Sequence, residues 1–544
     1  MKPARSFDYV IVGAGSAGCA AAARLSEDAD ATVAVVEAGP PAVGRLFEIP
    51  RLFGLQLKTT FDWDLQTEPE PGLAGRRTYL PRGRVIGGTS SMNTQLYVRG
   101  NRADYDGWRD ELGLEGWGYS DVLPVFKHQE DNERGADDYH GVGGPLRVSD
   151  ARSVDPLLTD WVEAALAAGH PATPDFNGPQ QEGVGVYQLT QRDGLRWSSS
   201  MAFLDPATAR PNVTVLPLTQ ALGIMWDSSG ERAVAIEVDH GSELSTIGIE
   251  RELVVCAGAY LSPHLLLVSG VGPADELRKV GVDPVLDLPE VGRNLRDHPG
   301  CFLSLRTLVD EPSGPDTAAD EELLRREGTG PMTWTEAGAF LRSSPDLEVP
   351  DLQFHAALGI VQEEGLSSGQ EQGLGFGPYV CRPVSTGSVQ LRSDVPYAKP
   401  RIRHNYFAER TDHSVLRHGL RMAMEIARRP ALRERLETLE EAAEAGLAPR
   451  SDTDEAIDDY IRDNAFSFYH PSGSCAMGRV VDSKLRVHGL TNVRVADTSV
   501  MPTELTGNLN APAIMIGERV GDFILGSSQP PSRSVEAAGS TTDA

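Results

Sequence analysis

The N-terminal part of the chain alternates between short apolar runs and a glycine-rich turn. Phe7 to Val12 is an apolar run rich in β-branched side chains, which is typical of a strand buried on both faces. Gly13-Ala-Gly15-Ser-Ala-Gly18 follows at once, and the alanine-rich segment from Ser16 to Leu25 predicts a helix. A second apolar run, Thr32 to Val36, predicts another strand. Strand, helix and strand in this order predict the first unit of a parallel α/β sheet.

The glycines of this turn have the spacing of a dinucleotide-binding fingerprint. Gly13 can adopt a backbone conformation closed to other residues, Gly15 lets the chain approach a pyrophosphate, and Gly18 allows close packing of helix on strand. The free N–H groups at the start of the helix would then face the phosphates. An ordinary tight turn is the alternative, but a predicted strand before the turn and another after the helix favour nucleotide binding.

The second predicted strand is followed by an acidic residue. Glu37 lies about twenty residues past the glycines, where this fingerprint places a ribose-binding acid. A carboxylate accepts hydrogen bonds from two ribose hydroxyls but repels a 2′-phosphate. Glu37 therefore favours FAD or NAD over NADP.

Later segments show both helical and strand periodicity. Helices are predicted at 156–168, 413–428 and 454–462, the last capped by Ser451 or Thr453. Strands are predicted at 212–216, 233–238 and 253–256, and exposed strands at 388–392 and 400–403. The polar, acidic stretch from Pro312 to Gly330 predicts a passage into a second domain.

Composition narrows the class of protein. The 544 residues, 40% hydrophobic and 24% charged, suffice for about two or three globular domains. The net charge of −28 argues against nucleic acid or an anionic membrane as a partner. No apolar stretch is long enough to span a bilayer, and Met1 to Ser6 leads directly into a strand, so a cytoplasmic protein is expected. The five cysteines lack metal-ligand spacing, so no metal site is predicted.

Three further blocks have their own chemical character. Gly83 to Trp108 combines small residues with hydroxyl and amide groups, and by itself it could be a surface loop. Gly258 to Gly272 follows the strand at 253–256. The C-terminal block contains Phe468 to Gly478, Leu490 to Pro502 and Gly507 to Arg519. With the N-terminal fingerprint, these motifs resemble the glucose–methanol–choline (GMC) oxidoreductase family over nearly the whole chain, most closely its choline dehydrogenase and alcohol dehydrogenase branch.

This resemblance implies FAD rather than NAD and an α/β fold. The expected architecture is a Rossmann-like FAD-binding domain formed by residues 1–155, 197–310 and 471–525. A substrate-binding domain of antiparallel sheet and helices is expected at 156–196 and 311–470, and a disordered tail at 526–544. The FAD is expected to be non-covalent, because Met92 stands where some relatives carry the histidine that tethers their flavin.

The resemblance also implies a set of cofactor contacts. They are Gly13, Gly15, Ser16, Ala17, Gly18, Glu37, Ala38, Arg84, Gly88, Ser90, Asn93, Ala221, Ala257, Gly258, Tyr469, Asp497, Asn510, Ala511 and Pro512. Pro512 is suited to the first turn of a helix, whose positive end would face the pyrimidine edge of the flavin.

The same resemblance assigns the chemistry. His470 is the expected base for the hydroxyl proton of an alcohol, a task that suits imidazole near neutral pH. Asn510 is the expected partner that holds the alkoxide oxygen. Glu336 and Tyr469 are candidate substrate contacts, since acids at the position matching Glu336 lie near the ammonium group in choline-oxidising relatives. The predicted reaction oxidises a primary alcohol to an aldehyde.

Several alternatives stay open at this stage. An NAD dehydrogenase, a flavin-bound hydroxynitrile lyase and a non-catalytic flavin-binding module would share parts of the pattern. A hydroxylated natural-product intermediate is as admissible a substrate as choline. The alcohol, the electron acceptor, the choice between oxidase and dehydrogenase, and the oligomeric state have no sequence signal.

Overall fold

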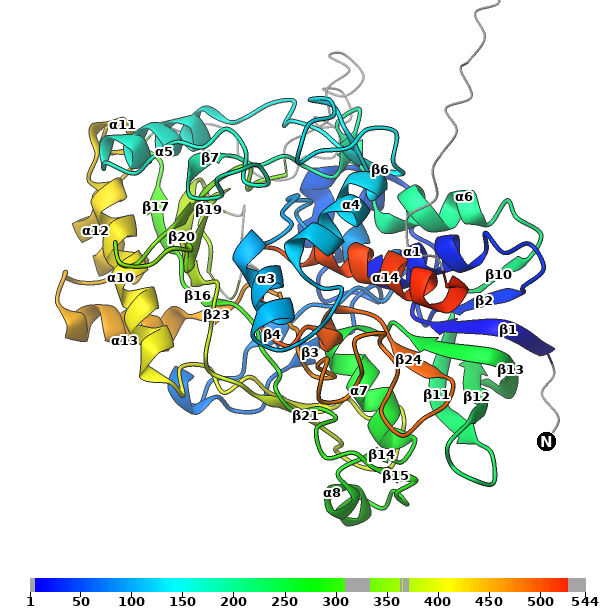
Figure 1. Ribbon diagram of the computed structural model, residues 1–544. Coiled ribbons are helices and arrows are strands. Elements are labelled where there is room, and N and C mark those ends of the chain that lie inside the picture. Colours follow the sequence, from blue (N-terminus) through cyan, green and yellow to red (C-terminus); the bar gives the residue numbers. More distant parts are fainter. Residues whose placement is uncertain (1–4, 309–332, 363, 365–370, 527–544) are drawn as a thin grey trace, which may run out of the picture.

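Two β-sheets organise the chain, and they lie on opposite sides of the view in Figure 1. The computed structural model describes residues 5–308, 333–362, 364 and 371–526. The predicted passage at 312–330 and the predicted tail, apart from Gly526, therefore lie outside the described residues.

The first sheet has seven strands in the order β10-β2-β1-β13-β12-β11, with β24 also pairing with β13. Its strands are β1 (Arg5–Val12), β2 (Val33–Val36), β10 (Val213–Leu216), β11 (Thr219–Trp226), β12 (Ala233–His240), β13 (Glu243–Val255) and β24 (Val493–Val495). All neighbours pair in parallel except in the ribbon formed by β11, β12 and the start of β13. The parallel strands bury both faces, which explains the continuous apolar runs.

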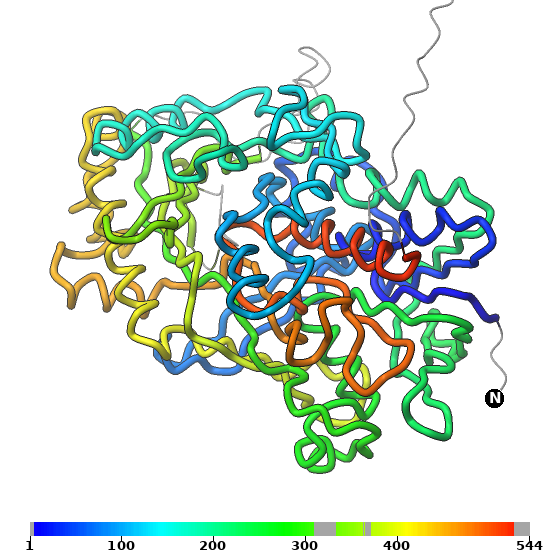
Figure 2. The backbone as a smooth tube through the Cα atoms, in the orientation of Figure 1, coloured from blue at the N-terminus to red at the C-terminus, as the bar shows by residue number. Residues whose placement is uncertain are grey.

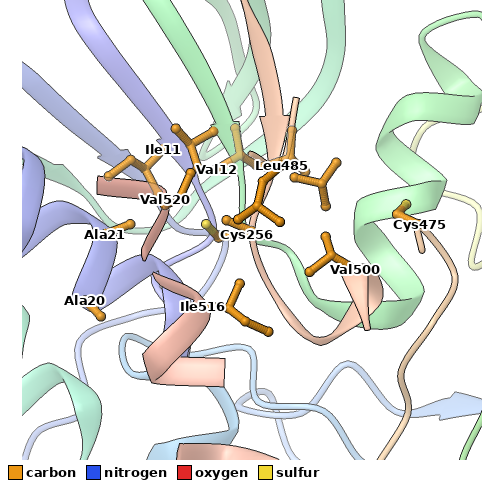
Figure 3. Packing of buried hydrophobic residues seen from close by; sticks show 14 of the residues in the cluster. Ile11, Val12, Ala20, Ala21, Cys256, Cys475, Leu485, Val500, Ile516 and Val520 are labelled. Carbon is orange, nitrogen blue, oxygen red and sulfur yellow. The ribbon is translucent and has the colours of Figure 1, made fainter. Parts of the chain in front are cut away.

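Two helices from opposite ends of the chain cover this sheet. The tubes of α1 (Ser16–Leu25) and α14 (Asn510–Leu525) lie side by side in Figure 2. Their close approach requires Gly517, because a Cβ there would overlap the Ala17 carbonyl of α1, while Gly18 lets α1 pack on the turn after β1, because a Cβ there would overlap the Gly13 carbonyl. Figure 3 shows Ala20 and Ala21 of α1 with Ile516 and Val520 of α14 in the same apolar core.

The second sheet is antiparallel and also has seven strands. They are β7 (Gly183–Val186), β16 (Pro299–Gly300), β17 (Leu303–Arg306), β18 (Ala337–Leu341), β19 (Leu352–Leu358), β20 (Gly373–Val380) and β23 (Phe466–Ser467). The helices packed around it are α5 (Pro156–Ala167), α10 (Arg410–Ala427), α11 (Pro430–Arg433), α12 (Leu439–Glu444) and α13 (Asp454–Asn464). Apolar side chains of these helices and strands form a second core.

Shorter elements connect the two sheets. In the nucleotide-binding half these are α2 (Arg45–Glu48), η1 (Pro50–Gln56), β3 (Leu65–Gln66), η2 (Pro71–Leu73), β4 (Tyr79–Leu80), η3 (Gly88–Ser91), α3 (Arg102–Asp110), α4 (Tyr119–Gln129), β5 (Glu130–Asn132) and β6 (Leu146–Val148). The others are β8 (Gln191–Arg192), β9 (Leu195–Arg196), η4 (Ser200–Leu204), α6 (Asp205–Ala207), α7 (Gly258–Val268), β14 (Val271–Gly272), α8 (Ala274–Lys279), β15 (Leu286–Asp287), β21 (Ser388–Gln390), β22 (Arg401–Arg403) and η6 (Thr498–Val500).

The predicted α/β fold class is confirmed, and the structure refines the predicted elements. Helix α13 is capped by the side chain of Thr453, which accepts a hydrogen bond from the Ala456 N–H. One predicted boundary needs correction: β16 and β17 fall inside the predicted FAD segment 197–310 but pair with strands of the second sheet. Two-residue and four-residue strands carry too little periodicity to show their sheet in the sequence.

Two predicted absences, of a membrane span and of a metal site, can be compared with the described residues, and the state of the cysteines can be added. No helix among residues 5–308, 333–362 and 371–526 is long and apolar enough to cross a membrane. Within the same ranges, no group of three His, Cys, Asp or Glu residues is arranged to hold a metal. The five cysteines are free and buried.

Candidate active site

A cavity of about 520 Å³ runs from the first sheet to the second. One end is lined by Gly13, Glu37 and Ala38, which follow β1 and β2. The other end is lined by His355 on β19 and by His470, which follows β23. The cavity thus lies at the carboxyl ends of the parallel strands, where α/β sheets bind their ligands.

The nucleotide end is built by the N-terminal fingerprint. Gly13 has φ +100°, which favours glycine, and Gly15 precedes the first turn of α1 at the cavity wall. The Glu37 carboxylate accepts hydrogen bonds from the Ala14 N–H at 2.9 Å and the Gly39 N–H at 2.8 Å. Burial raises the pKa of Glu37 to about 7, although these N–H groups favour the carboxylate. Each oxygen retains a lone pair for a ribose hydroxyl.

A second carboxylate closes the middle of the cavity. Asp497 accepts a hydrogen bond from the Gly258 N–H at 2.8 Å and another from the Ser262 hydroxyl. Burial raises the pKa of Asp497, while its hydrogen bonds oppose that change. Asp497 thereby ties the first turn of α7 to the segment after β24.

Most residues predicted to bind the cofactor line this cavity. They are Gly13, Gly15, Ser16, Ala17, Glu37, Ala38, Gly88, Asn93, Ala221, Ala257, Gly258, Tyr469, Asp497 and Asn510.

The other predicted cofactor residues, Gly18, Arg84, Ser90, Ala511 and Pro512, do not line the cavity. Gly18 packs against Gly13, and the Ser90 hydroxyl donates to the Gly87 carbonyl and so holds the second glycine turn. The Arg84 guanidinium lies over the Trp63 ring, 5.3 Å from its centroid. Ala511 and Pro512 are buried in the first turn of α14. These residues therefore support the cavity wall and do not face the cavity.

His470 lies at the other end of the cavity between His298 and Asn508. Its Nδ1 is 2.9 Å from His298 Nδ1, and its Nε2 is 3.0 Å from Asn508 Nδ2. His298 Nε2 is 3.0 Å from the carbonyl oxygen of Cys381, which can only accept. His298 therefore carries its proton on Nε2, so His470 donates through Nδ1 and keeps Nε2 free to accept.

A second chain of hydrogen bonds fixes the orientation of Asn508. The Tyr379 hydroxyl donates to Gln353 Oε1, and Gln353 Nε2 donates to Asn508 Oδ1 at 3.0 Å. Asn508 must therefore turn its Nδ2 toward His470. The site thus holds one acceptor nitrogen and one amide donor facing each other.

The electrostatics of this end favour neutral imidazoles. Burial lowers the pKa of His470 well below its usual value, and His298, His355 and Arg82 lower it further. Burial also lowers the pKa of His298 to about 4 and that of His355 to about 3. His470 is therefore unprotonated at neutral pH, which is the state a base requires.

The structure corrects the predicted partner of His470. Asn510 lines the cavity, but its Oδ1 accepts a hydrogen bond from the Ser16 hydroxyl at 2.7 Å, at the nucleotide end. Asn508, two residues earlier, contacts His470 instead. The chain turns into α14 at Asn510, so the two asparagines serve different parts of the cavity.

The two predicted substrate contacts have different surroundings. Tyr469 has φ +66°, lines the cavity, and donates its hydroxyl to the Glu364 carbonyl. Glu336 is fully buried, does not line the cavity, and accepts a hydrogen bond from the Thr333 N–H. Burial raises the pKa of Glu336 to about 7. Its Oε1 bonds to Thr333, and its Oε2 is buried without a hydrogen-bond partner just before β18.

Comparisons with known proteins show the family of the chain. Residues 7–300 and 383–517 match the two parts of the family described as GMC oxidoreductase. The oxygen-dependent choline dehydrogenase of Brucella anthropi is 39% identical over 534 residues, 95% of each chain. That of Rhizobium meliloti is 38% identical over 543 residues, 97% of each chain.

The chain belongs to the GMC oxidoreductase family.

Solved structures of other proteins share the fold. Pyridoxine 4-oxidase from Mesorbium loti is 30% identical, with a TM-score of 0.83 over 95% of this chain and 98% of that one. A fungal aryl-alcohol oxidase is 22% identical, with a TM-score of 0.79 over 96% and 99% of the chains, and supports the fold alone. As a member of the GMC family, the protein is an FAD-dependent oxidoreductase acting on a CH–OH group.

The residues present fit FAD. Gly15 has open space where a Cβ would stand, so a pyrophosphate can approach the backbone at the start of α1. Glu37 has lone pairs for the ribose, and Asp497 and Asn510 also line the cavity. The elongated cavity thus offers donors and acceptors along its whole length.

Sequence reasoning missed several residues of the reactive end. Asn508, His298, Gln353 and His355 are the polar ones, and Trp334 and Phe468 are aromatic. Asn508 could have been considered from the sequence, because the C-terminal block has one asparagine on each side of Leu509. Of the others, Gln353 and His355 lie on β19, whereas His298, Trp334 and Phe468 lie just outside strands of the second sheet, and only the fold brings these segments together.

We predict that acid precipitation releases the flavin of this GMC oxidoreductase into the supernatant. Met92 lines the cavity at the place where some relatives have a tethering histidine, and a thioether does not form that bond. The measurement is the absorbance of the supernatant and of the washed pellet after precipitation. Yellow colour retained by the pellet would contradict the prediction.

Proposed function

We propose that this enzyme oxidises a primary alcohol to its aldehyde, with His470 as the base and Asn508 as its partner. The observation that carries the proposal is the 3.0 Å contact between Asn508 Nδ2 and His470 Nε2. A donor and an acceptor facing each other at this distance match the two needs of an alcohol oxygen, which must lose a proton and be stabilised as charge develops.

The hydroxyl of a bound alcohol would insert between these two groups. His470 Nε2 accepts the hydroxyl proton, while Asn508 Nδ2 donates a hydrogen bond to the oxygen. The FAD, when bound, supplies the acceptor for the hydride that leaves the carbinol carbon. Protonated His470 would keep its Nδ1–H bond to His298, so the ring does not need to rotate during proton transfer.

Several buried groups hold the base in position. Asp297 Oδ1 accepts hydrogen bonds at 2.9 Å from the backbone N–H groups of His298 and His470. The His298 ring stacks on Tyr379, with centroids 5.1 Å apart. The same Tyr379 hydroxyl orients Gln353, so one aromatic residue supports both halves of the pair. Such preorganisation lowers the cost of reaching the reactive geometry.

The names of the relatives support an alcohol substrate. The curated relatives are choline dehydrogenases described as oxygen-dependent, and the 30% identical structure is a pyridoxine 4-oxidase. No observation favours a flavin-bound hydroxynitrile lyase, or a natural-product intermediate as the substrate, over oxidation of a simple alcohol. We also propose a cytoplasmic location, which five free, buried thiols support.

Anaerobic reduction tests the proposed function. Primary alcohols of different shape are mixed with the purified yellow enzyme without oxygen, and the flavin absorbance is followed. At least one is expected to bleach it and to yield the aldehyde. Air is then admitted, and recovery of the yellow colour would identify dioxygen as an acceptor. An enzyme that no alcohol bleaches would contradict the proposed function.

A further inference from the structure

From the charges around His470 we infer that the substrate is an uncharged alcohol with a flat, aromatic body, not a cation such as choline. This inference rests on the proposed alcohol oxidation and deepens it by naming the substrate class. It follows from the carboxylates, the cations and the rings that line the reactive end of the cavity.

Carboxylates are missing from the described wall around His470. Among residues 5–308, 333–362, 364 and 371–526, the acids that line the cavity are Glu37 and Asp497. Both accept hydrogen bonds from the backbone N–H groups of the nucleotide-binding half. Glu336, the acid expected to meet an ammonium group, lies outside the cavity wall and accepts from the Thr333 N–H.

The charged side chain that lines the cavity beside His470 is a cation, whereas the Asp297 carboxylate, which accepts from the His470 N–H at 2.9 Å, does not line the cavity. Arg82 lines the cavity, and its Nη2 donates to the Tyr469 carbonyl at 2.6 Å, next to His470 in the chain. Its Nε is buried without a hydrogen-bond partner, and its guanidinium forms no ion pair with a carboxylate of the described residues, whereas its backbone N–H donates to Asp62 Oδ1 at 3.0 Å. Its positive charge contributes to the lowered pKa of His470. A cationic substrate would leave water and meet a like charge, with no carboxylate in the described wall beside His470 to contact it directly.

The aromatic rings that line the cavity do not reverse this preference for an uncharged substrate over a cation. Rings attract quaternary ammonium groups through their faces, but the guanidinium of Arg51 already lies over the Trp334 ring, 5.3 Å from its centroid. Phe466 and Phe468 are instead nearly parallel, with centroids 5.1 Å apart and an angle of 16°. Phe302 lies 5.2 Å from Phe468 at an angle of 32°. These rings pack against one another, and all three also line the cavity, where their remaining surface offers contact to the flat ring of an aromatic substrate.

The experiment compares ligands of equal shape on the holoenzyme. Choline and 3,3-dimethylbutan-1-ol differ in one atom, a positively charged nitrogen in place of carbon. Benzyl alcohol and cyclohexylmethanol differ in aromaticity, and 4-(hydroxymethyl)benzoate adds a negative charge to the ring. Dissociation constants are measured by calorimetry under anaerobic conditions, and the bleaching rate is recorded separately for each compound.

We expect 3,3-dimethylbutan-1-ol to bind at least about tenfold more tightly than choline. Benzyl alcohol is expected to bind more tightly than cyclohexylmethanol and than 4-(hydroxymethyl)benzoate. Choline binding as tightly as its isostere, a preference for the benzoate or for cyclohexylmethanol, or no binding of any compound would overturn the inference. Binding without bleaching by any alcohol would contradict the proposed function, while the order of the dissociation constants would still decide the inference.

A matched pair of variants tests whether Arg82 causes the discrimination. Arg82→Gln removes the charge, whereas Arg82→Lys retains it at a similar length. The ratio of the dissociation constants of choline and its isostere should fall severalfold toward one in Arg82→Gln and stay near the parent value in Arg82→Lys. An unchanged ratio in Arg82→Gln, with full flavin content, would overturn the electrostatic explanation.

Discussion

Replacing His470 with Ala is expected to slow anaerobic flavin reduction by about a hundredfold to ten thousandfold, the usual range for loss of a general base. The substitution removes the Nε2 that faces Asn508 and leaves the alcohol proton without an acceptor. The His470 side chain bonds to His298 and Asn508 and to no predicted cofactor contact, so flavin content should survive. Rapid mixing with a saturating primary alcohol measures the rate.

A histidine elsewhere on the same cavity provides the control. His264 lines the wall from α7 and is also buried, with its pKa lowered by burial to about 4. His264→Gln should reduce its flavin at close to the parent rate. A His470→Ala enzyme that bleaches as fast as the parent, with correct folding and full flavin, would remove His470 from the mechanism.

The pH dependence of the parent enzyme follows from the same base. Because the folded environment lowers the pKa of His470, the imidazole stays unprotonated at pH values below its ordinary pKa of 6.5. Flavin reduction at saturating alcohol should therefore stay constant from pH 8 to below about 6.5 and fall only at more acidic pH.

Replacing Asn508 with Ala is expected to slow the same step by about a hundredfold to a thousandfold. This is the range for removing one hydrogen-bond donor from a developing oxyanion. Asn508→Asp should be impaired as well, because a carboxylate keeps the size of the side chain but cannot donate when ionised. The reduction rates of both variants, measured beside that of the parent, check this prediction.

Asn510→Ala is the matched comparison for Asn508→Ala. Asn510 bonds to Ser16 at the nucleotide end, so its loss should weaken flavin retention more than it slows reduction of the flavin that remains. The assignment of Asn508 as the partner of His470 fails if Asn510→Ala reduces the rate of flavin reduction more than Asn508→Ala does, and if Asn508→Ala reduces its flavin at the parent rate.

The nucleotide end could be predicted from the sequence because it is local. One strand, one turn and one helix place Gly13, Gly15 and Ser16 at the cavity, and Glu37 follows on the adjacent strand. Each of these positions depends on a backbone requirement that the neighbouring residues reveal. The family resemblance then supplied FAD and His470.

The reactive end depends on long-range packing and was only partly predictable. His298, Gln353 and Asn508 meet from three distant segments, and no periodicity in the chain records that meeting. Whether Asn508 or Asn510 faces His470 depends on the residue at which α14 begins. Moving that start by two residues would exchange the two positions, and a sequence pattern does not fix a helix end that closely. The predicted boundaries place Glu336 inside the substrate-binding domain, but only the fold shows which way its carboxylate points.

The double variant His470→Ala/Asn508→Ala tests most directly whether the two side chains act on the same alcohol oxygen. Anaerobic flavin reduction is measured in the parent, both single variants and the double variant, with flavin content matched. Two groups that stabilise one transition state are not additive, so the double variant should lose less than the product of the two single losses. A loss equal to that product would show independent action and contradict the paired mechanism.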